Sequence, residues 1–236
     1  MALPFFYTDE IKPGSDHLVL NEETSKHVVQ VLRMKTGEQL LLTDGNGNIY
    51  TAEITHDHKK KCEVRILSST QEPKPVRQIS IGISLVKNNS RFEWFLEKAT
   101  EIGISEIIPL LCERTEKQHF RFERMKGILI SAMLQSKQCW LPVLSEPVQF
   151  DNLVMRQFDN FNKLIAHCLE DGNKENIHHQ ISKSSNQLIL IGPEGDFSAK
   201  EIEAALQNNF IPVALGNSRL RTETAGIVAA TILCIS

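Results

Sequence analysis

Two short segments near the C-terminus combine glycines with polar side chains in a way that could bind a small molecule. Gly192-Pro193-Glu194-Gly195 follows the apolar run Leu188 to Ile191, and glycines at both ends of a turn let backbone amides approach a ligand closely. The second segment, Gly216 to Thr224, carries two arginines, a glutamate and two threonines just before an apolar stretch. The first turn alone is also typical of a structural connection. The second has more polar groups than a helix cap needs, which indicates a functional site.

Several other kinds of site lack their usual motifs. Neither segment matches the Gly-x-x-x-x-Gly-Lys-Ser/Thr loop or the Gly-x-Gly-x-x-Gly turn, so ATP hydrolysis and NAD chemistry lose their simplest support. The five cysteines never form a Cys-x-x-Cys pair, and His178-His179 has no partners at the spacing of a zinc site. We therefore expect no bound metal and no disulfide framework.

The chain shows neither a secretory signal nor a segment long enough to span a membrane. Asp9 and Glu10 come before any apolar signal core could form. The longest mainly apolar stretch, Ala225 to Ile235, is about half of the roughly 20 residues that a spanning helix needs. We expect a buried C-terminal helix and a cytoplasmic protein.

The C-terminal two thirds of the chain alternate between predicted strands and helices. The predicted strands are Ile79 to Val86, Glu106 to Leu111, Leu164 to His167, Leu188 to Ile191 and Ile211 to Leu215. Predicted helices include a stripe from Phe92 to Ala99, Arg121 to Gln138 and Asp151 to Phe158. The Ser-x-x-Glu spacing of Ser198 and Glu201 is typical of a capping box and marks the start of a further helix. This rhythm predicts an α/β domain with a mainly parallel sheet. Because ligands bind at the carboxyl ends of such strands, the two glycine segments should meet at one edge.

The N-terminal residues predict a small barrel-like β module with one helix. Asp44-Gly45-Asn46-Gly47 separates two strand-like runs, 40–43 and 48–54, as in a hairpin, and a further strand covers Glu63 to Leu67. The predicted helix, Glu22 to Leu32, places Val28, Val31 and Leu32 on one face. Prolines between Ser68 and Arg77 mark a boundary, so we expect domains at 1–70 and 71–236.

Charge is unevenly distributed in a chain whose net formal charge is −3. Residues 114–138 contain six lysines and arginines against two glutamates, with His119, Phe120 and Phe122 interleaved. This composition is typical of a patch for a polyanion. A solvated helix face with its aromatic side chains in the core explains it equally well.

Together, these residues resemble the RsmE-type 16S rRNA (uracil-N3)-methyltransferases of the SPOUT superfamily. The resemblance rests on Gly192 to Gly195, on Leu215-Gly216, and on Leu220 to Ala225. It extends to Val31-Leu32-Arg33, Gly37 and Asp44-Gly45 in the first domain, and to Lys87, Glu97 to Gly103, Pro109, Arg114 and Gln135-Ser136 in the second. Each piece is weak alone, but the set in this order is highly specific.

The resemblance implies a PUA-like RNA-binding β-barrel domain followed by a SPOUT-type α/β domain with a C-terminal trefoil knot. It also implies S-adenosylmethionine as the cofactor, a homodimer, and methylation of N3 of one uridine in the decoding region of 16S rRNA. The substrate is then naked 16S rRNA or the 30S subunit. General topology rules make knots improbable, so strand and helix patterns alone do not predict one.

The resemblance also assigns residues to roles. The implied cofactor-binding residues are His167, Ile191, Gly192, Pro193, Glu194, Gly195, Leu215, Gly216, Asn217, Leu220 and Thr222. A lone histidine at a strand end is also typical of a structural residue. Arg221 is the implied catalytic residue that holds the uracil or its phosphate, and Glu223 is either the base or a helix cap that orients Arg221. From charge, we expect RNA contacts at Arg33 in the first domain, at Lys87, and at Arg114, Arg121 and Arg124 of the basic stretch.

The chain departs from the family pattern at a few positions. Asp196 stands where a second glycine usually follows the Gly-Pro-Glu-Gly turn, and Ser218 replaces a common arginine. The stretch Lys137 to Trp140 is less basic than usual, and Leu134 replaces a glutamate. Three other hypotheses stay open: a SPOUT methylase of a different RNA position, a catalytically inactive RNA-binding assembly factor, and a generic nucleotide-binding module.

Overall fold

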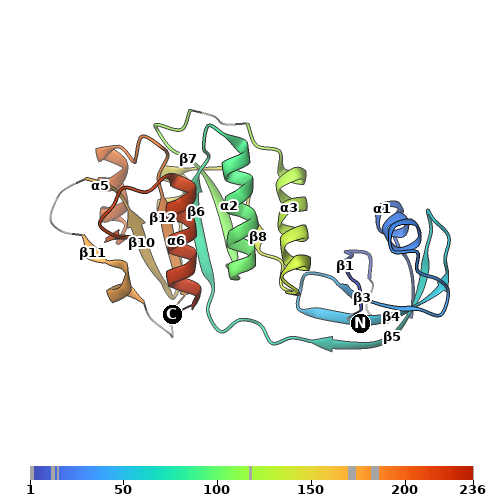
Figure 1. The fold of residues 1–236 in the computed structure, drawn as a ribbon. Helices are drawn as coiled ribbons and strands as arrows, with labels where there is room; N and C mark the ends of the chain where they lie inside the picture. The colour runs from blue at the N-terminus through green and yellow to red at the C-terminus, as the bar shows by residue number, and fades with distance from the viewer. Residues whose placement is uncertain are drawn as a thin grey trace. The chain divides into compact units, whose positions relative to one another are not determined.

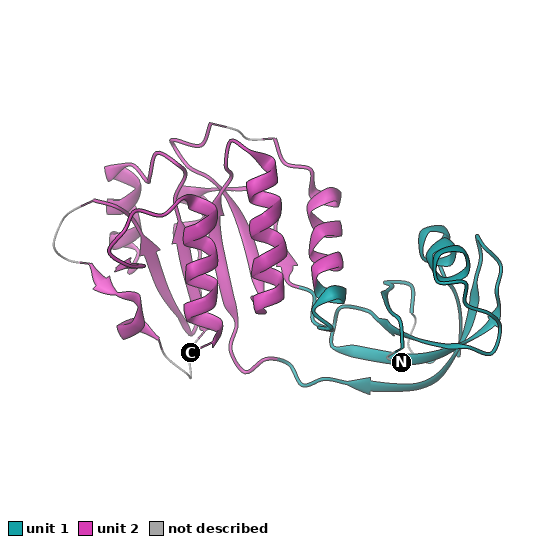
Figure 2. Cartoon of the chain, viewed as in Figure 1, with its two compact units in different colours: residues 1–74, 133–141 teal, residues 75–132, 142–236 magenta. Residues whose placement is uncertain are grey.

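The computed structural model describes residues 3–11, 14, 16–116, 119–169, 174–181 and 186–235. It divides into two compact units (Figure 2). Unit 1 contains residues 1–74 and 133–141, and unit 2 contains residues 75–132 and 142–236. The predicted boundary after residue 70 stays a prediction. Within the described residues, no helix is long and apolar enough to cross a membrane.

Unit 1 is built on a five-stranded sheet with the strand order β1-β3-β4-β5-β2. Its elements are β1 (Phe5–Tyr7), β2 (His17–Val19), α1 (Glu22–Lys26), a π-helical turn (His27–Val31), β3 (Gln39–Thr43), β4 (Asn48–His56) and β5 (Glu63–Gln71). The predicted hairpin is confirmed, because β3 and β4 pair antiparallel around Asp44 to Gly47. Asp44 stabilises this turn by accepting hydrogen bonds from the Asn46 amide (2.8 Å) and the Asn48 side chain (2.6 Å).

The predicted helix from Glu22 to Leu32 is wrong in its second half. Asn21 caps α1 by accepting from the Thr24 amide, but after Lys26 the backbone changes to π-helical hydrogen bonding, with Leu32 N–H donating to His27 O. This change rotates the later residues away from the helical stripe. Val28 is fully buried, whereas Val31 is 68% exposed.

Residues 133–141 belong to unit 1, which the sequence did not predict. The Trp140 ring packs on the hairpin turn so closely that a Cβ at Gly47 would lie 2.3 Å from it. The backbone also pairs there, with Gly47 N–H donating to Cys139 O at 3.0 Å and Leu141 N–H to Gly45 O at 2.8 Å. The segment therefore fixes the hairpin.

Unit 2 contains an eight-stranded sheet whose observed pairings are all parallel, which confirms the predicted α/β class (Figure 1). The strand order is β11-β13-β10-β12-β6-β7-β8, and β9 also pairs with β7. The elements are β6 (Ile79–Ser84), α2 (Asn89–Ile102), β7 (Glu106–Leu111), α3 (Phe122–Gln135), β8 (Val143–Leu144), β9 (Val148–Gln149), α4 (Phe150–Val154), β10 (Phe161–Ala166), β11 (Glu175–Asn176), a 3-10 turn (Ile177–Gln180), β12 (Asn186–Ile191), α5 (Ala199–Gln207), β13 (Ile211–Ala214) and α6 (Thr222–Ile235). The end of α3, from residue 133, lies in unit 1.

Two helices, α2 and α6, pack side by side over β6 (Figure 1). A core of buried apolar side chains forms where Phe150 of α4 and Ile202 of α5 meet Leu188 and Leu190 of β12. The run from Leu188 to Ile191 is confirmed as a strand buried on both faces, since its residues are all 2% exposed or less. The run from Ile211 is less buried than expected, because only Val213 of β13 is fully buried. The trefoil knot stays a prediction, because strand order does not specify how the chain passes through its own loops.

Two predicted helices are shorter than expected. The helix predicted from Arg121 to Gln138 covers Phe122–Gln135, and it ends because Lys137 adopts a left-handed backbone with φ 58°. The helix predicted from Asp151 to Phe158 covers Phe150–Val154, and Phe158 instead packs edge-on against Phe161.

Candidate functional site

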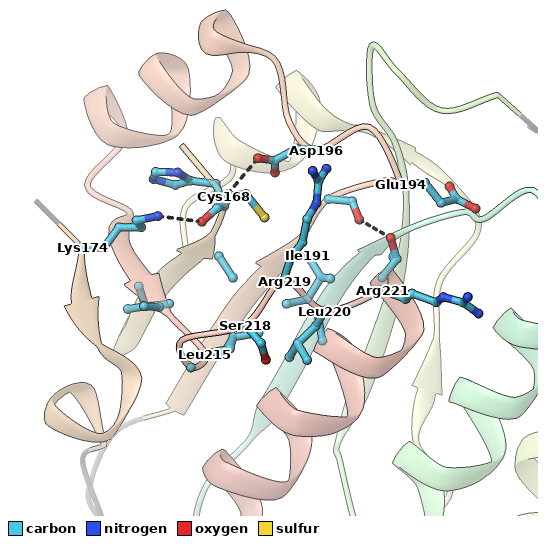
Figure 3. A pocket seen from close by; sticks show the side chains of 18 of the residues that line it. Cys168, Lys174, Ile191, Glu194, Asp196, Leu215, Ser218, Arg219, Leu220 and Arg221 are labelled. Atoms are coloured by element: carbon cyan, nitrogen blue, oxygen red, sulfur yellow. Dashed lines mark hydrogen bonds between the residues drawn. The ribbon is translucent and has the colours of Figure 1, made fainter. Parts of the chain in front are cut away.

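A pocket of about 670 Å³ lies in unit 2 at the carboxyl ends of β10, β12 and β13 (Figure 3). These three strands are neighbours in the sheet, and they end at Ala166, Ile191 and Ala214. The connections that follow them line the pocket, so both glycine segments meet at one sheet edge as predicted.

Close packing explains the two glycines of the first connection. A Cβ at Gly192 would lie 3.1 Å from the ring and the backbone nitrogen of Phe197, and one at Gly195 would lie 3.3 Å from Cδ of Arg114. Thr222 Oγ1 donates a hydrogen bond to Gly192 O at 2.9 Å, which ties this turn to the start of α6. The turn is therefore packed from both sides.

The predicted start of the next helix is also confirmed. Ser198 accepts a hydrogen bond from the Glu201 amide, and the Glu201 carboxylate accepts one from the Ser198 amide, which is a complete capping box. The other oxygen of this carboxylate accepts from the Glu113 amide at 2.8 Å, just beyond β7. The connection between β12 and α5 is thus fixed at its far end.

Further contacts hold the middle of this connection. Arg114 Nη1 donates to Gly195 O at 2.7 Å, and the Lys87 amide donates to the Glu194 carboxylate at 3.1 Å. Arg114, implied as an RNA contact, therefore braces the glycine turn.

The second glycine segment is more exposed. Gly216 has φ 153°, a backbone that other residues rarely adopt, and Asn217 to Arg219 are exposed. Helix α6 begins at Thr222, and the Ala225 amide donates to Arg221 O at 2.8 Å. Arg221 lies at the pocket, and its side chain points away from that of Arg219 (Figure 3).

Glu223 faces α2 and is not among the residues that line the pocket. It is 7% exposed, and its Oε1 lies 3.7 Å from Nε of Arg91. Its Oε2 has no hydrogen-bond partner among the described residues. The cap hypothesis predicted that Glu223 orients Arg221. The observed ion pair is instead with Arg91.

The structure brings most of the implied cofactor residues together. His167, Ile191, Gly192, Pro193, Glu194, Leu215, Gly216, Asn217, Leu220 and Thr222 line the pocket, whereas Gly195 does not. Cys168 and Lys174 also line the pocket, although the sequence did not predict them as site residues. The position of Cys168, two residues after the end of β10, is a signal that could have indicated Cys168 as a pocket residue. Lys174 carried no comparable signal, and its Nζ donates to the backbone oxygen of His167 at 3.3 Å.

The basic residues implied as RNA contacts differ in their partners. Lys87 Nζ pairs with Glu116 at 2.9 Å, and this hydrogen bond raises the pKa of Lys87. Arg124 binds both carboxylate oxygens of Glu93, at 2.6 and 2.9 Å. Arg33 and Arg121 form no ion pair with an acidic side chain in the described part of the chain.

The aromatic side chains within the basic stretch contact one another. Phe120 lies edge-on against both Phe92 and Phe122, with ring centroids 6.2 and 6.4 Å apart. Phe92 is buried, and Phe120 and Phe122 are half-buried. This packing favours a structural role for these rings. No cluster that could hold a metal occurs among the described residues, and His178 and His179 lie in the 3-10 turn.

Comparisons with known proteins identify the family. Residues 72–234 match the model of the RNA methyltransferase domain, and residues 20–67 match the RNA methyltransferase PUA domain. The chain belongs to the RsmE family of RNA methyltransferases. The PUA-like character of unit 1 is confirmed by the same match.

Individual proteins and solved structures resemble this chain over most of its length. Ribosomal RNA small subunit methyltransferase E of Synechocystis sp. is 30% identical over 208 residues, covering 86% of this chain and 68% of that protein. A probable rRNA-methyltransferase from Porphyromonas gingivalis has 37% identity and a TM-score of 0.88, with 97% and 95% coverage. Ribosomal RNA small subunit methyltransferase E from Neisseria gonorrhoeae, bound to S-adenosyl methionine, has 28% identity and a TM-score of 0.84, with the same coverage.

Proposed function

We propose that this protein transfers a methyl group from S-adenosylmethionine to N3 of one uridine in the decoding region of 16S rRNA. The observation that carries the proposal is the pocket formed by the two glycine segments in a chain of the RsmE family. The similar protein from Neisseria gonorrhoeae binds S-adenosyl methionine, which supports the choice of cofactor.

The pocket fits such a cofactor in size and in chemistry. Its volume of about 670 Å³ lies within the usual range of small-molecule sites. Exposed backbone at Gly216 and Asn217 offers hydrogen-bonding groups, while Leu215 and Leu220 offer apolar contact to a flat base. The residues present would therefore hold the adenosine part mainly by backbone hydrogen bonds and packing.

Methyl transfer from a sulfonium needs positioning more than chemical assistance from the protein. The bound cofactor supplies an electrophilic methyl group and a neutral leaving group, so no metal and no covalent enzyme intermediate are required. Arg221 lies at the pocket and would hold the uracil, where its guanidinium stabilises negative charge on the carbonyl oxygens. This role makes Arg221 the proposed catalytic residue.

The proton on uracil N3 must leave before this nitrogen can attack, and Glu223 is the nearby acidic candidate. Its carboxylate is buried against Arg91 and outside the pocket lining. We therefore favour a positioning role in which Glu223 links the first turn of α6 to α2. The N3 proton then passes to solvent water, and Arg221 lowers the free-energy cost of forming the uracil anion by electrostatic stabilisation.

RNA binding is proposed to combine phosphate contacts from both units. Arg33 and Arg121 are exposed and form no ion pair with an acidic side chain among the described residues, so they are the strongest candidates. Lys87, Arg114 and Arg124 hold protein partners that RNA would have to share. Phosphate contacts give affinity without sequence information, so the target must be recognised by RNA shape and by its unpaired base. The homodimer and the cytoplasmic location stay predictions.

A deletion strain tests the proposed reaction. Mass-spectrometric mapping of 16S rRNA should find 3-methyluridine missing from the decoding region in that strain, and restored by the wild-type gene. Purified Arg221→Ala protein should methylate 30S subunits about a hundredfold more slowly, the usual cost of losing one electrostatic contact to developing charge. Arg156→Ala is a matched control, because Arg156 is exposed and lies outside the pocket.

Three results would contradict the proposal. Intact 3-methyluridine in the deletion strain would point to a different RNA position. Calorimetry with S-adenosylmethionine that shows no binding would favour an inactive assembly factor. Full activity of Arg221→Ala, with Arg156→Ala also active, would remove Arg221 from the mechanism.

A further inference from the structure

Asp196 is the residue of the first glycine connection that has a left-handed backbone. Its φ is 65°, whereas Gly192 and Gly195 are absent from the positive-φ positions. Aspartate and asparagine tolerate this conformation better than other side chains with a Cβ, but less well than glycine. A side chain that keeps a costly backbone conformation must make contacts that offset the cost.

The Asp196 carboxylate makes two such contacts. Oδ1 accepts a hydrogen bond from the Phe197 amide at 2.9 Å. Oδ2 accepts one from the Cys168 amide at 2.8 Å (Figure 3). Cys168 follows β10 and Asp196 follows β12, and these strands pair side by side up to Ala166 and Ile191. The carboxylate therefore joins two neighbouring connections that both line the pocket, with hydrogen bonds strengthened by its charge.

Neighbours on both sides of Asp196 are held independently. Arg114 donates to Gly195 O, and Phe197 is buried with its ring 5.2 Å from that of Phe150. Asp196 is thus presented from a fixed backbone. In contrast, Cys168 and Leu169 are exposed, and the hydrogen bond to Asp196 is the observed restraint on the Cys168 amide.

We propose that Asp196 is a positioning residue that holds residues 167–169, directly after β10, against the glycine turn and so sets one wall of the cofactor pocket. This inference rests on the proposed function, because it assigns S-adenosylmethionine to the pocket. Asp196 acts through the Cys168 backbone, and its loss loosens that wall without removing a glycine or an arginine of the site.

Asp196→Gly and Asp196→Asn separate the carboxylate from the backbone conformation. Glycine adopts φ 65° without strain but lacks both acceptor oxygens. The Kd of the Asp196→Gly protein for S-adenosylmethionine should therefore rise about tenfold, which corresponds to the loss of one charge-assisted hydrogen bond. Asparagine tolerates the same φ and keeps one acceptor oxygen for the Cys168 amide. The Kd of the Asp196→Asn protein for S-adenosylmethionine should therefore rise only about threefold.

Asn209→Gly is the matched control. Asn209 also has a left-handed backbone, with φ 63°, and it lies between α5 and β13 outside the pocket lining. Replacing it by glycine relieves the same kind of strain. Its Kd for S-adenosylmethionine should stay within about twofold of the wild-type value, because no pocket contact changes.

Hydrogen exchange of the Cys168 amide in protein without cofactor gives a readout that does not depend on the proposed function. Exchange should be about tenfold faster in Asp196→Gly than in the wild type, and unchanged in Asn209→Gly. Unchanged exchange at Cys168 would overturn the proposal, and so would faster exchange with an unchanged Kd. If wild-type protein does not bind S-adenosylmethionine, the proposed function fails. Faster exchange at Cys168 would then still support the restraint itself.

Discussion

Gly226 lies in α6 at the place where this helix packs against α2 and β6. A Cβ built on Gly226 would lie 2.6 and 2.8 Å from ring atoms of Phe95 and 2.9 Å from Cδ1 of Ile83. Both neighbours are fully buried, so neither side chain can swing into solvent. Replacing Gly226 by alanine therefore tests how tightly α6, which begins at the pocket, is seated on the sheet.

Two opposing effects set the size of the change. Alanine stabilises a helix interior by about 1 kcal/mol relative to glycine. Inserting a methyl group into a packed core costs about 1–3 kcal/mol, and three contacts below 3.0 Å place this site at the upper end. We expect Gly226→Ala to lower the free energy of unfolding by about 2 kcal/mol.

Gly127→Ala isolates the helix effect from the packing effect. Gly127 lies in α3, and a Cβ added there would have no other atom within 4 Å beyond its own helix backbone and chain neighbours. This variant should be stabilised by up to about 1 kcal/mol, so the two variants should differ by about 3 kcal/mol. Urea unfolding followed by circular dichroism measures the free energy of unfolding of both variants, because the long helices that give the signal lie mainly in unit 2. Equal stabilisation of the two variants would refute the close contact between α6 and α2.

Two further predictions concern titrating groups. Burial raises the pKa of Cys112 to about 12 and the pKa of Cys234 to about 11, so these thiols should react slowly with iodoacetamide at about pH 8. Exposed Cys168 should be modified first, and bound S-adenosylmethionine should slow the modification of Cys168. Peptide mapping that finds Cys112 modified equally fast would contradict this. Hydrogen bonds from Arg124 lower the pKa of Glu93, so its carboxylate stabilises the fold above its ordinary pKa of 4.5, and this contribution is lost as the pH falls through the lower folded value. Thermal unfolding should thus show a smaller loss of stability in Glu93→Gln than in wild type between about pH 6 and about pH 3, and equal losses would argue against the pair.

The sequence predicted the parts of the site that depend on backbone conformation and strand order. Apolar runs predicted the parallel strands, and the Gly-Pro-Glu-Gly turn together with the Ser198 capping box predicted where α5 begins. Parallel strands expose their carboxyl ends at one edge, so the meeting of the two glycine segments followed from topology alone. The cofactor and the reaction came from the resemblance, because these turns lack a motif with its own chemistry.

The contacts of side chains from distant parts of the chain were not predictable in this way. Arg114 was assigned to RNA from its charge, yet its guanidinium donates to Gly195 O, 81 positions further along. Glu223 was paired with Arg221 because they are close in sequence, whereas the fold places it against Arg91. The π-helical turn after Lys26 also carries no periodic signal, because it changes the period itself.

The two halves of the pocket are fixed to very different degrees. Groups from three other places hold the first connection, namely the Lys87 amide, the Arg114 guanidinium and the Thr222 hydroxyl. The second connection, 215–221, has mostly exposed residues and no observed side-chain hydrogen bond within the described chain. Binding to a preformed wall costs little conformational entropy, while ordering an exposed loop costs more. We therefore expect the second connection to order around the cofactor, so that the position of Arg221 depends on whether the cofactor is bound.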